Sequence, residues 1–270
     1  MYPELFHFQL PGFMWKLFHI KHVTVYTYAF CIALGCLIAA IYTKRAARKD
    51  LQIQDLSNNF FYLIFIFGFI GGKLFYYLEK PLYYFNNPSL LLDNFSGGYV
   101  FYGSFVTIIP MIIYYLNKKN IAVLPMLDIL AITTLIVHAF GRFGCFCGGC
   151  CFGLPTNSWV GIIFPNSNHV AVHPSQLYEF FVLLLILSVL VIVKTNKKFH
   201  GQIFFLYVGL YAISRMFLEF YRGDVRGFII NDMLSHSQFI AFCLLLTAVL
   251  FYIKFKNHKL LVINTIKNEK

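Results

Sequence analysis

The sequence predicts an all-α, polytopic integral membrane protein with seven transmembrane helices and a single membrane-embedded domain over residues 1–270. Composition is the first reason: 59% of the residues are hydrophobic and only 12% are charged, against roughly 25% charged in soluble domains. Apolar runs of about 20 residues, the length that crosses a bilayer, are the second reason. Basic clusters between these runs are the third, because such clusters mark the ends of membrane spans.

Seven apolar segments are candidates for these helices. They are residues 23–42, 60–78, 99–116, 121–140, 177–193, 201–221 and 236–255. Asp128 and His138 interrupt the fourth segment, and we expect Asp128 to be structural. Pro110 lies inside the third segment. A membrane helix tolerates proline where neighbouring groups satisfy the freed carbonyl, so the third segment is still predicted to span.

Basic residues are distributed unequally between the two sides of the predicted bundle. The links after the first, third, fifth and seventh spans carry most of them, from Lys44 to Lys270. The opposite segments carry only Lys16, Lys21, Lys80, Arg142, Arg222 and Arg226. The positive-inside rule therefore predicts an amino end outside and a carboxyl end in the cytoplasm. The net charge of +11 belongs largely to these links, so we expect no nucleic-acid partner.

A polar, glycine-rich segment interrupts the apolar pattern from Gly141 to Glu179 and reads GRFGCFCGGCCFGLPTNSWVGIIFPNSNHVAVHPSQLYE. Glycine lets a backbone turn tightly and approach a ligand closely. We therefore expect a bend at the end of the fourth span, where Arg142 and free backbone N–H groups face one anion. Gly153 is the last glycine of the first, glycine-rich part of this segment.

Four cysteines in this segment allow three interpretations. Cys145, Cys147, Cys150 and Cys151 follow the spacing C-x-C-x-x-C-C. A zinc or iron–sulfur site is one interpretation, but no second Cys/His pair follows, which weakens it. A disulfide in an oxidising outer compartment is another. In the third, small side chains line a tight bend; we favour it over the metal site and expect no metal ligand among them.

The motif HPSQLYE, His173 to Glu179, predicts the start of a helix. Pro174 is expected near its first turn and Ser175 or His173 at its cap. Capping is the role that the spacing favours for His173, and general base is the alternative. Glu179 then lies in the early part of this helix.

The sixth span carries ionisable residues at membrane depth, where each is a functional candidate because its burial is costly. Arg215, Glu219 and Arg222 are spaced four and three apart and are predicted to share one helical face. A buried Arg–Glu pair accounts for only one arginine, since one carboxylate cannot neutralise two. With Arg142 these arginines predict a positive pocket near the outer leaflet, which suits a lipid phosphate because guanidinium binds phosphate bidentately. Lys73 is expected to snorkel to the interface.

Three motifs together resemble the prolipoprotein diacylglyceryl transferases: GRFGCF with its closing glycine, HPSQLYE, and the R…E..R pattern of the sixth span. The resemblance covers about Tyr26 to the seventh span and implies seven spans, with the amino end outside, in the bacterial plasma (inner) membrane. Enzymes of this family move the diacylglyceryl group of phosphatidylglycerol to the lipobox cysteine in the signal peptide of a lipoprotein precursor. A thioether forms, glycerol phosphate leaves, and the resemblance implies no metal or other cofactor.

By matched position, the resemblance also implies roles for single residues. Arg142 would hold the headgroup phosphate, and Arg215, oriented by Glu219, would assist the departing phosphate. Tyr26 and Gly153 match positions of the family's motifs and are expected to contribute to substrate binding. Arg222 is expected to join Arg142 at the headgroup.

Several positions depart from the family's motifs. The usual GR.GNF.NGE..G reads GRFGCFCGGCCFG, so Cys145 and Gly148 replace asparagines and Cys150 replaces a glutamate. The HGG motif at the start of the third span reads YGS, with Tyr102 in the position of the histidine. Tyr102 and His173 are then the two candidate proton acceptors, and a phenol with an ordinary pKa of about 10 is a reluctant base.

Two other functions remain open from the sequence alone. A membrane anion transporter would use the same arginines as a passage site, although the paired halves common in transporters are not visible. A thiol–disulfide relay for exported proteins would use the four cysteines of the polar segment.

Overall fold

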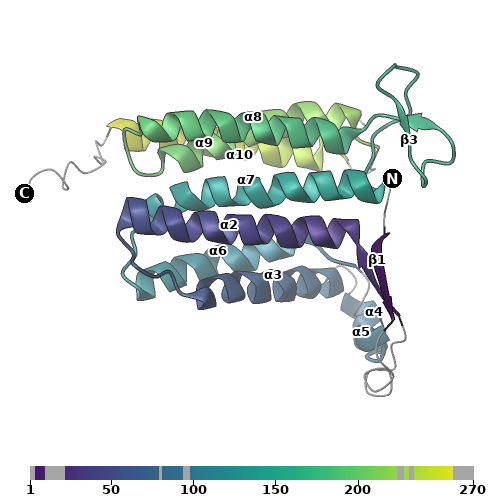
Figure 1. The fold of residues 1–270 in the computed structure, drawn as a ribbon, viewed down its shortest axis with the longest axis horizontal. Coiled ribbons are helices and arrows are strands. Elements are labelled where there is room, and N and C mark those ends of the chain that lie inside the picture. The colour runs from purple at the N-terminus through teal and green to yellow at the C-terminus, as the bar shows by residue number, and fades with distance from the viewer. Residues whose placement is uncertain are drawn as a thin grey trace, which may run out of the picture. The chain divides into compact units, whose positions relative to one another are not determined.

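The computed structural model describes residues 4–9, 22–78, 81–93, 98–223, 228–230 and 234–257, and it is mostly helical (Figure 1). Its helices are α2 (Thr27–Leu51), α3 (Asn58–Leu78), α4 (Pro81–Asn86), α5 (Leu90–Asp93), α6 (Phe101–Lys118), α7 (Val123–Gly148), α8 (Ser175–Thr195), α9 (Gln202–Leu218) and α10 (His236–Asn257), with a 3₁₀ turn η1 (Glu219–Tyr221). Three antiparallel hairpins are added to the predicted helices: β1 (Glu4–Gln9) with β2 (His22–Tyr26), β3 (Ile162–Ile163) with β4 (Ala171–Val172), and β5 (Phe228–Ile230) with β6 (Leu234–Ser235).

The chain divides into two compact units. The first comprises Met1–Thr43 and Leu127–Lys270, and the second comprises Lys44–Met126. The candidate functional residues are thereby divided as well, because Tyr102 belongs to the second unit and all the others belong to the first. That the whole of 1–270 forms one membrane-embedded domain stays a prediction.

Six helices of the described residues are long and apolar enough to cross a membrane. They are Thr27–Leu51, Asn58–Leu78, Val123–Gly148, Ser175–Thr195, Gln202–Tyr221 and Ser237–Lys256. Each coincides with a predicted span, and the remaining prediction, 99–116, falls on the 18-residue helix α6. That α6 also crosses the membrane stays a prediction, as does the orientation of the termini. Some of the basic residues behind that orientation lie outside the described residues, namely Lys16, Lys21, Lys80, Arg226, Lys259, Lys267 and Lys270.

Apolar side chains three and four positions apart build the core of the first unit. Its buried members lie on α7, α8 and α9: Ala131, Ile132, Leu135, Ala139, Leu183, Ile186, Leu190 and Ile203. Helix α9 packs against both α8 and α10, as Figure 1 shows. Helix α2 approaches α7 closely at Gly35, where a Cβ atom would lie 2.6 Å from the Cβ of Phe140. A small residue at this contact lets two membrane helices pack backbone to side chain.

Asp128 is structural, as expected, and it caps the start of α9. Its Oδ1 accepts the backbone N–H of Phe204 at 2.9 Å, and its Oδ2 accepts that of Gly201 at 2.8 Å. The ammonium of Lys197 lies 3.2 Å from the same Oδ2. Asp128 therefore satisfies donors that the first turn of a helix leaves without intrahelical partners.

We expect Asp128→Ala to lower the free energy of unfolding by about 2 kcal/mol, because it removes a helix cap and leaves buried donors unsatisfied. Thermal unfolding in detergent, followed by circular dichroism, measures this change. The matched control is Asp55→Ala, since Asp55 is exposed and its loss should have little effect. Equal melting temperatures for the two variants would contradict the capping role.

The second unit is held by a close contact between α3 and α6. A Cβ atom at Gly71 would lie 2.6 Å from the carbonyl oxygen of Gly103, and one at Gly103 would lie 2.5 Å from that of Gly71. Ser104 donates a hydrogen bond to the carbonyl of Gly68 at 2.8 Å. Gly103 and Ser104 of the YGS motif therefore join two helices. The side chain of Tyr102, the first residue of that motif, lies outside the described residues.

Lys73 does not snorkel to an interface as predicted. Only 7% of its surface is exposed, and its ammonium donates to the carbonyl of Gly98 at 2.9 Å. The same nitrogen lies 5.3 Å from the ring centre of Tyr76, a cation–π distance. The ammonium of Lys73 is thus stabilised by a carbonyl and an aromatic face inside the unit, and not by interfacial water as the prediction assumed.

Candidate active site

A buried carboxylate, Glu179, organises the ionisable side chains of the first unit. It lies in the second turn of α8 and has only 2% of its surface exposed. Its Oε1 lies 3.1 Å from His138 Nε2 and accepts the hydroxyl of Tyr211 at 3.3 Å. Its Oε2 lies 3.1 Å from Arg142 Nε and 3.6 Å from an Nη atom of Arg222. We call these five residues the Glu179 cluster.

Three separate segments supply the partners of Glu179. His138 and Arg142 lie four residues apart on α7 and so project from one face of that helix. Tyr211 comes from α9, and Arg222 from the extended segment after η1. A carboxylate at this depth is tolerated because charged and hydrogen-bonding partners surround it.

A second ion pair, Arg215 with Glu219, lies near the end of α9. Their side chains are in direct contact, and the hydroxyl of Ser235 donates to Glu219 at 3.1 Å. One Nη atom of Arg215 makes this ion pair, and the other is buried and has no hydrogen-bond partner within the described residues. Across both groups, the three guanidinium groups of Arg142, Arg215 and Arg222 face two carboxylates. The site therefore carries an excess of positive charge.

The sequence suggested that Arg142 lies at a bend, but the structure places it inside a continuous helix. Helix α7 continues through the predicted turn to Gly148, so the backbone N–H groups near Arg142 belong to the helix. The glycines serve packing against α2: a Cβ atom at Gly144 would lie 3.0 Å from the Cβ of Cys31. The chain turns only afterwards, where Gly149 has φ 68° and Cys151 has φ 62°.

Arg215, Glu219 and Arg222 do not share one helical face, although that arrangement was predicted. The α-helix ends at Leu218, the next three residues form η1, and Arg222 is extended with φ −84° and ψ 139°. This break turns Arg222 toward Glu179, while Arg215 keeps Glu219 as its ion-pair partner. The change of backbone conformation thus gives each of the two arginines a carboxylate.

Gly153 positions the segment that carries Arg222. It forms a β-bridge with Arg222, and its N–H donates to the carbonyl of His173 at 2.8 Å. A Cβ atom at Gly153 would lie 2.1 Å from the carbonyl oxygen of Tyr221. Three backbone segments meet here at distances that only glycine allows. The structure therefore gives Gly153 a backbone role.

We expect Gly153→Ala to lower the free energy of unfolding by about 1–3 kcal/mol, the usual cost of overpacking. Gly209→Ala is the matched control, because a Cβ atom there would lie 3.8 Å from Leu245 Cδ1, an ordinary contact. In the interior of α9 that alanine should be neutral or stabilise the helix by up to about 1 kcal/mol. Unfolding in detergent measures both, and a Gly153→Ala protein as stable as the control would refute the close contact.

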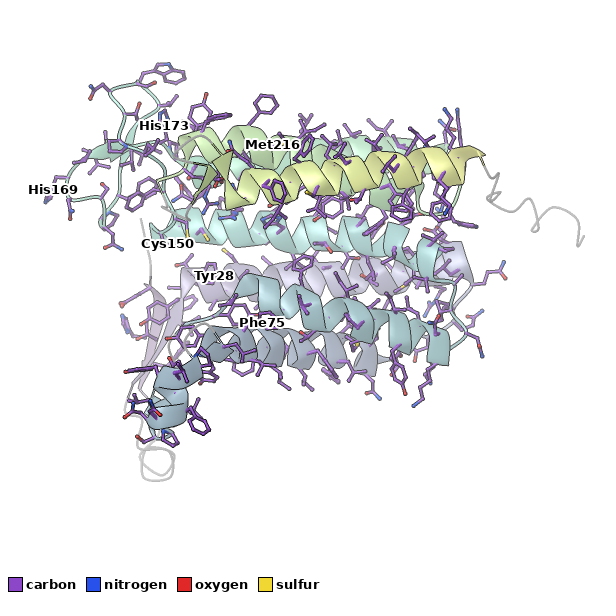
Figure 2. All side chains as sticks on the ribbon, turned by 180° about the vertical axis from the view of Figure 1, so that it is seen from behind. Tyr28, Phe75, Cys150, His169, His173 and Met216 are labelled. Carbon is purple, nitrogen blue, oxygen red and sulfur yellow. The ribbon has the colours of Figure 1, made fainter. Side chains whose placement is uncertain are left out.

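His173 and Ser175 do not cap α8 as predicted. The cap residue is Pro174, which offers no side-chain hydrogen bond. His173 Nδ1 lies 3.0 Å from the hydroxyl of Tyr178, and its ring packs edge-on against Tyr221. Ser175 donates to the carbonyl of Cys151 at 3.1 Å. Figure 2 shows His173 and Cys150 toward the same end of the helices.

Tyr26 ends β2, and 54% of its surface is exposed. Within the described residues, no hydrogen bond joins it to the Glu179 cluster. Sequence reasoning therefore found the three arginines and Glu219 but missed the carboxylate at the centre. The signal was present, because Glu179 and His138 are ionisable residues in predicted spans.

The cysteines of the polar segment fall into two groups. The Sγ atoms of Cys145, Cys150 and Cys151 lie within 4.8 Å of one another, and Cys147 is not part of this group. All seven cysteines of the chain are free thiols. Hydrogen bonds from the neighbouring thiols, with the charges of Arg142 and Arg222, lower the pKa of the Cys151 thiol. The three-thiol group is thus electrostatically linked to the arginines.

Comparison with known proteins identifies the family to which this arrangement belongs. The sequence profile described as prolipoprotein diacylglyceryl transferase matches residues 16–254. The chain belongs to the prolipoprotein diacylglyceryl transferase family. Its site accordingly belongs to a family of membrane transferases, which favours that function over an anion transporter or a thiol–disulfide relay.

Relatives within the prolipoprotein diacylglyceryl transferase family match nearly the whole chain. The phosphatidylglycerol–prolipoprotein diacylglyceryl transferase of Clostridium tetani is 35% identical over 229 residues, covering 83% of this chain and 91% of its own. Transferase 2 of Clostridium perfringens is 33% identical, with 88% and 92% covered. The Rickettsia bellii transferase is 32% identical, with 88% and 94% covered.

Proposed function

We propose that this protein transfers the diacylglyceryl group of phosphatidylglycerol to the lipobox cysteine of lipoprotein precursors in the bacterial inner membrane. The thiol loses its proton, and its sulfur attacks the glycerol carbon that carries the phosphate. A C–S bond forms, the C–O bond breaks, and glycerol phosphate leaves with the bonding electron pair. The activity for which the relatives are named supports this reaction, and the six apolar helices support the membrane location.

The observation that carries the proposal is the excess of guanidinium groups around the two buried carboxylates. Glu179 engages the Nε of Arg142, which leaves the two Nη atoms of that arginine for a phosphate. A guanidinium held in this way is pre-organised, because its side chain loses less entropy when the lipid binds. We assign the headgroup phosphate to Arg142, with Arg222 beside it.

Arg215 supports the departure of glycerol phosphate in this proposal. One of its Nη atoms is held by Glu219. The other is buried without a hydrogen-bond partner among the described residues, so it is available to the negative charge that develops on the leaving group. Preorganised donors at such a position are a large source of rate acceleration. Glu219 orients Arg215, and His173 and Tyr102 stay the candidate proton acceptors.

The test is a direct transfer assay with purified protein, phosphatidylglycerol and a lipobox peptide. Mass spectrometry should find the peptide heavier by one diacylglyceryl group on its cysteine. A peptide with serine in place of that cysteine, and phosphatidylcholine in place of the donor, are the negative controls. If folded wild-type protein leaves the peptide unmodified when phosphatidylglycerol is present, the proposed reaction is wrong.

A further inference from the structure

Three cysteine thiols converge where α7 ends. Gly149 and Cys151 both adopt positive φ angles, of 68° and 62°, which fold the chain back over the last turn of the helix. The N–H of Cys150 donates to the carbonyl of Cys145 at 3.1 Å. As a result the Sγ atoms of Cys145, Cys150 and Cys151 all lie within 4.8 Å of one another.

This spacing fits three sulfur ligands of one Zn²⁺ ion. With Zn–S bonds of about 2.3 Å, tetrahedral geometry separates the sulfur atoms by roughly 3.8 Å. Three thiolates and Zn²⁺ carry one net negative charge. The positive charges of Arg142 and Arg222 act on Cys151, and they favour such an anionic complex. A metal that prefers thiolate ligands therefore suits the chemistry of this group.

The group provides three ligands and an accessible side. Within the described residues, no further His, Cys, Asp or Glu joins the three thiols. Cys145 is buried, whereas Cys150 and Cys151 are exposed, so an incoming ligand can approach from their side. Structural zinc sites have four protein ligands, but catalytic sites have three and keep one position open for water or substrate.

We propose that Cys145, Cys150 and Cys151 bind one Zn²⁺ ion and leave its fourth position for the cysteine thiol of the acceptor peptide. The role of the fourth ligand rests on the proposed transferase function. When the acceptor binds, its sulfur displaces water from the metal and its proton passes to solvent, with no change of oxidation state. The product of this step is a zinc-bound thiolate, because coordination activates thiols that are otherwise protonated at neutral pH.

The position of the site supports this role. The acceptor sulfur must become a thiolate close to the phosphate that leaves, and Cys151 lies within the electrostatic reach of Arg142 and Arg222. Two of the proposed ligands, Cys145 and Cys150, also stand at positions where the family motif has an asparagine and a glutamate. This chain thus has thiol ligands at two positions where the family motif has other side chains.

Metal analysis of the purified, reduced full-length protein tests the site. We expect one zinc per chain in the wild type and loss of zinc in Cys150→Ser. Cys147→Ser is the matched control, because Cys147 lies on α7 with Cys145 but outside the three-thiol group, and it should keep the zinc. Co²⁺ substitution of the wild type should give the sulfur-to-metal charge-transfer bands of a tetrahedral thiolate site. Should Cys150→Ser fail to fold, which circular dichroism detects, the wild-type cobalt spectrum decides alone.

A peptide titration of the Co²⁺ protein tests the fourth position. A lipobox peptide with cysteine should intensify the charge-transfer band by adding a fourth sulfur, and the serine peptide should not. The proposal is overturned by absence of metal in the wild type, by a disulfide among the three thiols, or by a spectrum indifferent to the cysteine peptide. Lipid transfer at the wild-type rate by zinc-free protein would overturn the zinc-bound thiolate step and leave the transferase function standing. Zinc binding without any transfer would overturn the transferase function and leave the metal site standing.

Discussion

Replacing Glu179 with alanine is expected to lower the free energy of unfolding by about 3–5 kcal/mol, the cost of removing one partner from a buried ion pair. Glu179 is almost completely buried and contacts His138, Arg142 and Arg222. Without the carboxylate, two guanidinium groups lose the negative charge that offsets their burial. Chemical unfolding in detergent, followed by circular dichroism, measures the loss.

Two further variants separate charge from shape. Glu179→Gln keeps an oxygen for the hydroxyl of Tyr211 but removes the charge opposite Arg142, so its stability should fall between wild type and alanine. Glu4→Gln removes a carboxylate from an exposed pair with His7 and should change stability by less than about 1 kcal/mol. If Glu179→Ala unfolds at the same denaturant concentration as Glu4→Gln, the central role of Glu179 is wrong.

Hydropathy predicted the helices well because membrane burial leaves few alternatives. In lipid every backbone polar group must find a partner within the segment, so an apolar run of about 20 residues becomes a helix. The predicted span 60–78 corresponds to Asn58–Leu78, and 177–193 to Ser175–Thr195. The three hairpins escaped prediction because two- to six-residue strands are too short for a clear alternating pattern.

The same physics explains the error at the end of the fourth span. Five glycines between 141 and 153 suggested a bend, since glycine weakens a helix by about 1 kcal/mol in water. Close packing of Gly144 against Cys31 of α2 offsets that cost in a membrane helix, where small residues allow helices to approach. Local propensity did not predict a helix that tertiary contacts stabilise.

The arginines and the pairing of Arg215 with Glu219 were predictable from the sequence, but Glu179 as the partner of Arg142 and Arg222 was not. A charged residue in an apolar span is visible in the sequence, and that criterion selected Arg215 and Glu219. Which carboxylate meets which arginine depends on how α7, α8 and the segment after η1 come together. Glu179 and Arg142 lie 37 positions apart in the sequence, and no periodicity joins them.

Replacing Arg142 with alanine is expected to reduce the rate of lipid transfer by about 10²–10³-fold, the typical effect of removing one preorganised donor from a charged transition state. Arg215→Ala should fall in the same range, because the Nη atom that Glu219 does not engage is buried and has no hydrogen-bond partner among the described residues. Arg45→Ala, at an exposed position of α2, is the control and should retain wild-type activity. The assay is mass spectrometry of the lipobox peptide.

Lysine at position 142 distinguishes charge from geometry. Arg142 uses Nε for Glu179 and keeps its Nη atoms for phosphate, and a lysine ammonium cannot serve both partners in this planar arrangement. Arg142→Lys should therefore recover only a small part of the lost activity. If it restores the wild-type rate, a simple positive charge is sufficient and bidentate binding is excluded.

A double variant decides whether Glu179 acts through Arg142. If Glu179 only positions this guanidinium, then Glu179→Gln should add little to the loss of transfer already caused by Arg142→Ala. The two activity losses should then be far from additive. The double variant should also be more stable than Glu179→Gln alone, because it no longer buries the Arg142 guanidinium without a counter-charge. Additive losses of activity would mean that Glu179 contributes to the reaction independently of Arg142.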